Sequence, residues 1–198
     1  MGTWTLAGPM LAAGLGAAVL ASAGIGSAQH REVEAHEHGR GSLNIAIEGG
    51  RVSMELEAPG VDLVGFEHAA KSDKQKAAVE SAKKLLAAPQ GLFKLPAAAG
   101  CALKETKVEL EGADDGHAAK GHDHKDGDKS DHAADHSGFR AEYAFDCTAP
   151  QGLTGIVFDY FKAFAGAQRL DVTVITPRGQ SKFEVSRAKP HIDLGGIM

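Results

Sequence analysis

One short segment of the chain, residues 111–138, is rich in residue types that bind metal ions. It holds half of the ten histidines in the 198-residue sequence, namely His117, His122, His124, His132 and His136. Neutral imidazole is a preferred ligand of zinc, copper and nickel, and neighbouring carboxylates add attraction for a cation. The two closest donors, His122 and His124, are separated by a single aspartate. The composition predicts several exchangeable transition-metal sites; the alternative is a solvated acidic linker.

The same segment carries the net charge of the protein. It contains eight acidic residues and three lysines, a net charge of -5, whereas the rest of the chain has 18 acidic and 18 basic residues. The segment has no large apolar side chain, so burial cannot offset the entropy cost of ordering it. We therefore expect a disordered, exposed loop. The balanced charge elsewhere argues against a surface for nucleic acid or anionic membrane.

Three histidines outside the segment are further candidate ligands. His36 and His38 are two positions apart, so in an extended chain their side chains project from one face and can share a metal ion. The alternative for this pair is a disordered tail. His68 follows an apolar run, and its spacing alone favours a structural role.

The first 28 residues predict a signal peptide. They carry no charged side chain, and the run from Pro9 to Gly26 is almost entirely small or apolar. Small residues then precede Gln29, which favours cleavage after Ala28, with Ala23 as the second choice. An uncleaved anchor helix is the alternative. We expect an exported domain at residues 29–198 with no membrane span.

The chain has two cysteines, Cys101 and Cys147. An even pair in an exported protein predicts a disulfide, which here would close a loop around the whole histidine-rich segment. Such a bridge would pin both ends of that segment to the folded body. The alternative is a pair of thiolate ligands for a metal ion.

Alternation of apolar and polar residues predicts most of the regular structure. Expected strands cover residues 43–47, 52–56, 101–110, 139–147, 170–174 and 183–185. Two helical segments are expected, one from Ser72 with a capping box to Gln75 and a stop at Pro89, the other over residues 156–165. These elements predict an α+β fold with antiparallel sheet. A similar order of elements on the two sides of the loop suggests two related halves.

Several short motifs occur in an order that resembles the ZrgA-type family of periplasmic zinc-uptake proteins. They are HEHG at 36–39, LNIA at 43–46, MELEAP at 54–59, GFEH at 65–68, LPAAAGC at 95–101 and ITPRGQ at 175–180. The resemblance covers nearly the whole chain after the predicted signal peptide. It implies zinc binding by a folded site as well as by the histidine-rich segment, and it makes His36, His38 and His68 the expected ligands of the folded site.

The resemblance also implies a periplasmic protein that captures or buffers zinc and supports an ABC-type importer or its solute-binding protein. No catalysis is expected. A metal-dependent hydrolase is disfavoured, because the chain has neither an H-E-x-x-H nor a G-x-S-x-G motif. A storage or resistance protein for copper or nickel is the other alternative; only four methionines and no thiolate cluster argue against Cu(I).

Overall fold

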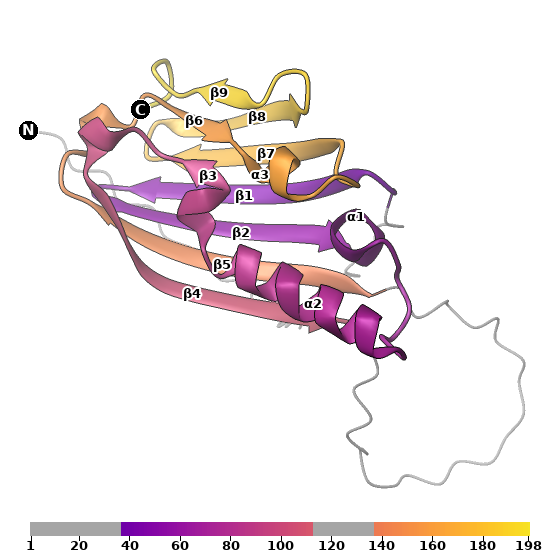
Figure 1. Cartoon of the computed structure of the whole chain (residues 1–198). Helices are drawn as coiled ribbons and strands as arrows, with labels where there is room; N and C mark the ends of the chain where they lie inside the picture. The colour runs from indigo at the N-terminus through magenta and orange to yellow at the C-terminus, as the bar shows by residue number, and fades with distance from the viewer. Residues whose placement is uncertain (1–36, 113–136) are drawn as a thin grey trace, which may run out of the picture. The chain divides into compact units, whose positions relative to one another are not determined.

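The computed structural model describes residues 37–112 and 137–198 (Figure 1). In these ranges the chain forms two β-sheets and three α-helices. Their order is β1 (Arg40–Glu48), β2 (Arg51–Pro59), α1 (Gly60–Val64), α2 (Asp73–Leu86), β3 (Phe93–Lys94), β4 (Cys101–Glu111), β5 (Gly138–Cys147), β6 (Gly155–Phe158), α3 (Tyr160–Ala163), β7 (Arg169–Thr176), β8 (Gly179–Ser186) and β9 (His191–Asp193). The predicted α+β class is confirmed.

The larger sheet has six strands in the order β4-β5-β2-β1-β7-β8. All neighbours are antiparallel except β1 and β7, which are parallel. The predicted antiparallel pairing is therefore confirmed for four of the five neighbouring pairs, and this one pair makes the sheet mixed. Since β5 and β7 run in the same direction, the chain between them must cross back over the sheet, and it does so through β6 and α3. Alternation along a strand reveals its buried face but not its direction.

One face of the large sheet packs on the helices and on the small sheet β3-β6-β9 (Figure 1). The apolar residues that alternate along β1, β2, β5 and β7 are all buried on this face, as their spacing predicts. An aromatic cluster joins the two layers, with the Phe93 ring centroid 6.0 Å from that of Tyr143 and 5.8 Å from that of Phe158. This continuous core packs against one face of the large sheet.

The predicted helix 156–165 is wrong over its first part. Residues Gly155–Phe158 form strand β6, which pairs with β3 and β9, and only Tyr160–Ala163 is helical. Ile156 and Phe158 are buried while Val157 between them is half-exposed, which is the alternation of a strand. The apolar residues of this range therefore belong to a strand and then to a single turn of helix.

The two halves of the chain share one sheet. Strand β5, from beyond the histidine-rich segment, lies between β4 and β2, and β7 lies beside β1. Every strand of the second half that joins the large sheet therefore depends on a strand of the first half, directly or through one neighbour. The two halves form a single core, whatever their ancestry.

The predicted capping box at α2 is confirmed. The Ser72 hydroxyl accepts the Gln75 backbone N–H at 3.2 Å, and the Gln75 side-chain oxygen accepts the Ser72 N–H at 3.0 Å. The helix buries Val79, Ala82 and Leu86 and ends before Pro89. The cap therefore sets Ser72 as the end of the segment that connects α1 to α2.

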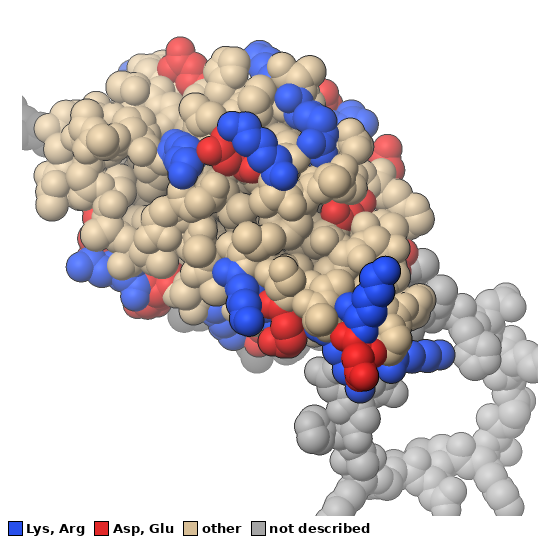
Figure 2. Space-filling view, viewed as in Figure 1, with Lys and Arg blue, Asp and Glu red and all other residues tan. Residues whose placement is uncertain are grey.

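The surface on the helix side has basic and acidic side chains interspersed with uncharged areas (Figure 2). Among the helices in the described ranges, none has the length and apolarity needed to cross a bilayer. The predicted signal peptide at residues 1–28 lies outside the described residues.

Candidate metal site

The histidine-rich segment is inserted at the tip of the β4–β5 hairpin. Strand pairing extends to Glu111 opposite Gly138, so the predicted loop bounds of 111–138 are wrong by one residue at each end. The ladder continues because Phe139 and Leu110 still face the apolar side, which keeps the two strands together up to the next pair. The five histidines of the segment lie outside the described residues, as does His36.

Ser137, at the C-terminal end of this insertion, is hydrogen-bonded to residues at the same end of the large sheet, where a second polar cluster lies. The register pairs Pro59, the last residue of β2, with Gly138, the first residue of β5. His38 lies two residues before β1, whose start runs beside the end of β2. The fold therefore brings the described part of the HEHG motif, residues 37–39, and the GFEH motif close to the base of the loop.

The imidazole of His38 contacts the carboxylate of Glu67, with Nε2 3.2 Å from Oε2. Because a carboxylate oxygen only accepts, Nε2 of the neutral ring is the donor, and the lone pair lies on Nδ1. The His38 side chain is 67% exposed and that of Glu67 is 13% exposed. A partly buried carboxylate that orients an exposed imidazole is the usual outer-shell partner of a metal-binding histidine.

Glu67 is itself fixed to the end of the loop. Its backbone carbonyl accepts the N–H of Ser137 at 2.7 Å, and the Ser137 carbonyl accepts the N–H of Gly60 at 2.8 Å. The residue at which the described chain resumes after the histidine-rich segment is therefore anchored to the partner of His38.

A buried carboxylate lies behind this contact. Asp62 is 5% exposed, and its Oδ1 accepts the Gly39 N–H at 2.7 Å. Burial raises the pKa of the Asp62 carboxyl, while the Gly39 hydrogen bond opposes the rise. A raised pKa in the folded state means that the ionised carboxylate becomes a cost to the fold as pH increases. A bound cation nearby would offset that cost.

His68 has a different set of contacts. Its Nδ1 lies 2.9 Å from the Ala69 carbonyl oxygen, and its ring stacks on Phe66 with centroids 5.1 Å apart. A carbonyl accepts, so Nδ1 carries the hydrogen and Nε2 holds the lone pair, 3.4 Å from the Gln75 amide nitrogen. Gln75 is the capping residue of α2, so the helix cap also orients this ring. The lone pair of His68 Nε2 can thus bind a metal ion once the Gln75 side-chain amide moves away from it.

Within residues 37–112 and 137–198, no three histidine, cysteine or acidic side chains are arranged to hold a metal ion. His38 and His68 contact different partners, and their common role as ligands stays a prediction. Sequence reasoning missed Glu67 and Asp62. Glu67 could have been noticed because it stands inside the GFEH motif; nothing in the sequence marks Asp62 as buried.

Comparison with known proteins places this chain in a family. A family model described as ZrgA family zinc uptake protein matches residues 35–194. The chain belongs to the ZrgA family of zinc uptake proteins. The matched range contains strands β4 and β5, which flank the histidine-rich segment, as well as His38, Glu67 and His68. A search of curated proteins finds no match to this chain.

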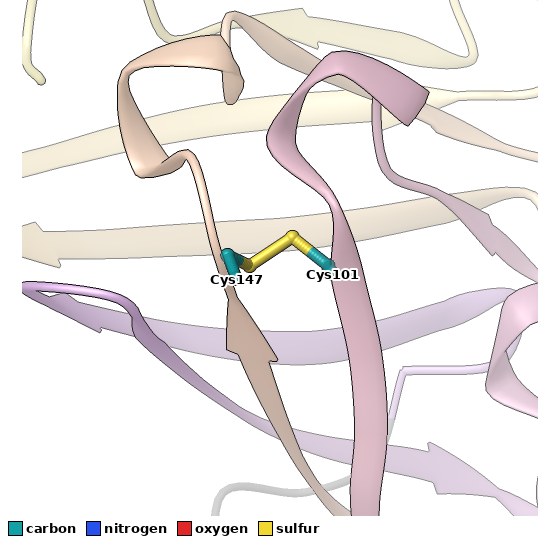
Figure 3. Close-up of a disulfide and its surroundings, with 2 residues drawn as sticks. All are labelled: Cys101 and Cys147. Carbon is teal, nitrogen blue, oxygen red and sulfur yellow. A yellow bond between two sulfur atoms is a disulfide. The ribbon is translucent and has the colours of Figure 1, made fainter.

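The predicted disulfide of this ZrgA family protein is confirmed (Figure 3). Cys101 and Cys147 face each other at the first residue of β4 and the last of β5, 46 residues apart in sequence. The bridge consumes both thiols, so neither serves as a thiolate ligand. It lies at the opposite end of the hairpin from the loop, so the expectation that it pins the loop ends is wrong. Strand pairing and the Ser137 contacts hold them instead.

The turn that carries His38 depends on Gly39, which has φ +83°. A Cβ there would lie 3.1 Å from Cγ of Gln168. We expect Gly39→Ala to lower the free energy of unfolding by about 2 kcal/mol, because it adds a crowded contact to the left-handed backbone penalty. Gly65→Ala is the matched control, with φ +85° and nothing within 4 Å of its Cβ position; it should cost about 1 kcal/mol. Equal losses in urea unfolding would contradict tight packing at Gly39.

Proposed function

We propose that this protein binds zinc in the periplasm and supports zinc uptake through an ABC-type importer or that importer's solute-binding protein. Membership of the ZrgA family supports the link to zinc uptake. The single observation that carries the proposal is the position of the histidine-rich insertion, whose base is hydrogen-bonded to the partner of His38. The base of the insertion and the described candidate ligand His38 thereby lie at the same end of the large sheet.

Two groups of proposed zinc ligands suit successive steps of capture and transfer. The loop histidines, His117, His122, His124, His132 and His136, offer several alternative ligand pairs and so favour fast exchange. His36, His38 and His68, with Glu67 as the orienting carboxylate, form the tighter site. Because imidazole binds metal only when neutral, acidification should release zinc from both groups.

We propose that the protein acts by binding and not by catalysis. A catalytic zinc needs a fixed ligand set with an open position and a general base. Here the described candidate ligands are exposed on the surface, and transfer of the ion benefits from that accessibility. The disulfide supports a location in an oxidising compartment such as the periplasm.

Replacing His36 and His38 together by Ala should weaken the tighter zinc site by more than about tenfold, because it removes two of the three proposed histidine ligands, including the one that Glu67 orients. The measurement is competition titration of the full-length protein against a chelator of known affinity. His191→Ala is the control, since His191 is an exposed histidine on β9 of the small sheet.

The same variants should differ in zinc uptake when each is expressed in cells that lack the endogenous protein. Under zinc limitation, uptake of labelled zinc should be restored by the His191→Ala protein and restored less well by the His36/His38 variant. An unchanged affinity for the double variant would remove the pair from the site. Equal uptake with and without the protein would refute a role in zinc acquisition.

A further inference from the structure

Arg187, which directly follows β8, donates to an unusual number of backbone carbonyl groups. Its guanidinium lies 2.5 Å from the Phe161 oxygen, 3.1 Å from that of Phe164, 2.9 Å from that of Ala165 and 2.6 Å from that of Ala167. Its own backbone N–H donates to the Gln168 oxygen at 3.2 Å. These acceptors belong to α3 and to the α3–β7 turn, defined here as residues 164–168.

The turn needs such a donor because it has little regular structure of its own. Helix α3 has four residues, so it has no second turn; the Tyr160 carbonyl accepts the Phe164 N–H, whereas the Phe161 carbonyl accepts the Arg187 guanidinium. A planar guanidinium offers five N–H donors in a fixed fork, whereas a lysine ammonium is a point donor on a flexible stem. Arg187 therefore sets the shape of the turn as well as satisfying its carbonyl groups.

The turn in turn holds the backbone of the candidate zinc site. The N–H groups of Gln168 and Arg169 both donate to the Gly39 carbonyl at 2.9 Å. Gly166 packs so closely on α1 that a Cβ there would lie 2.6 Å from the Asp62 backbone oxygen. Both backbone groups of Gly39 are thus hydrogen-bonded: its carbonyl accepts from the turn, and its N–H donates to the Asp62 carboxylate.

We propose that Arg187 is a positioning residue of the zinc site. By fixing the α3–β7 turn it fixes Gly39, and through Gly39 it holds His38 against Glu67. This inference rests on the proposed function, because it assigns Arg187 to the tighter site suggested there. Within the described residues, the hydrogen bonds of the Arg187 guanidinium go to backbone carbonyl groups and not to His38 or His68.

The test uses the full chain with the five loop histidines replaced by Asn, so that only the tighter site is measured. In this background Arg187→Met should weaken zinc binding about tenfold in chelator competition. Arg178→Met is the matched control: Arg178 stands at the other end of the β7–β8 hairpin and donates to the Met198 backbone oxygen. It should leave zinc affinity unchanged. Arg187→Lys keeps the charge and provides a milder variant if the Met variant does not fold.

Amide hydrogen exchange of the metal-free proteins gives a second measurement. The amides of Gly39, Gln168 and Arg169 should exchange faster in the Arg187 variants than in the Arg178 variant. A lower melting temperature with unchanged affinity and unchanged exchange at Gly39 would show a purely structural role and overturn the inference. If the background chain itself binds no zinc at the tighter site, the proposed function fails, and the exchange data alone still decide whether Arg187 positions Gly39.

Discussion

Replacing residues 113–136 by a short Gly/Ser linker is expected to remove most of the zinc bound at saturation while leaving a folded protein with one tighter site. The linker, in place of a bare deletion, lets Ser137 keep its hydrogen bonds to Glu67 and Gly60. The strand ladder from Cys101 opposite Cys147 to Glu111 opposite Gly138 stays intact. Shortening the loop should even stabilise the fold by about 1 kcal/mol through a lower closure entropy.

Calorimetric titration with zinc measures both quantities, the stoichiometry and the affinity of what remains. A chain of native length with the five loop histidines replaced by Asn is the control, since it keeps the acidic residues. If that control binds as much zinc as the native chain, carboxylates and not histidines collect the ion. Complete loss of binding in the linker variant would refute a second site in the folded body.

Replacing Cys101 and Cys147 together by Ala should lower the free energy of unfolding by about 4 kcal/mol. The bridge closes a loop of 46 residues, and its loss returns that closure entropy to the unfolded chain. Denaturant unfolding of the variant, compared with the oxidised native protein, measures the loss. The variant and the reduced native protein are then two samples without the bridge. The two samples should agree, because both lack the same cross-link.

Zinc affinity provides the contrast in the same experiment. The disulfide lies at the opposite end of the β4–β5 hairpin from His38, so the tighter site should be unaffected as long as the protein is folded. A stability loss below about 1 kcal/mol would show that strand pairing already restrains the unfolded chain as strongly as the bridge does.

The parts of the fold that could be predicted are those with local patterns. Alternation placed the longer strands, and Ser72 with Gln75 marked the start of α2. The short strands β3 and β9 have three residues or fewer and leave too little pattern to detect. The parallel pairing of β1 with β7 depends on a crossover, which no local pattern encodes.

The candidate site shows the same division. His36, His38 and His68 could be selected by residue type, spacing and motif, and the loop histidines by their density. Glu67 contacts His38 across 29 positions, and Asp62 contacts Gly39 across 23. Arg187 acts on the candidate site indirectly, by fixing the α3–β7 turn that contacts Gly39. Such groups become visible only when the fold brings them together, because their chemistry consists of orienting a neighbour and not of binding an ion.

The position of the histidine-rich segment at a hairpin tip makes it a replaceable cassette. The ladder beneath it is complete at Glu111 and Gly138, and the core begins one pair later, so strand pairing and core packing do not depend on the length of the insertion as long as the Ser137 hydrogen bonds are kept. The closure entropy of a loop grows only with the logarithm of its length. If the protein acts as proposed, editing the insertion should raise or lower the number of zinc ions bound and leave the affinity of the folded end unchanged.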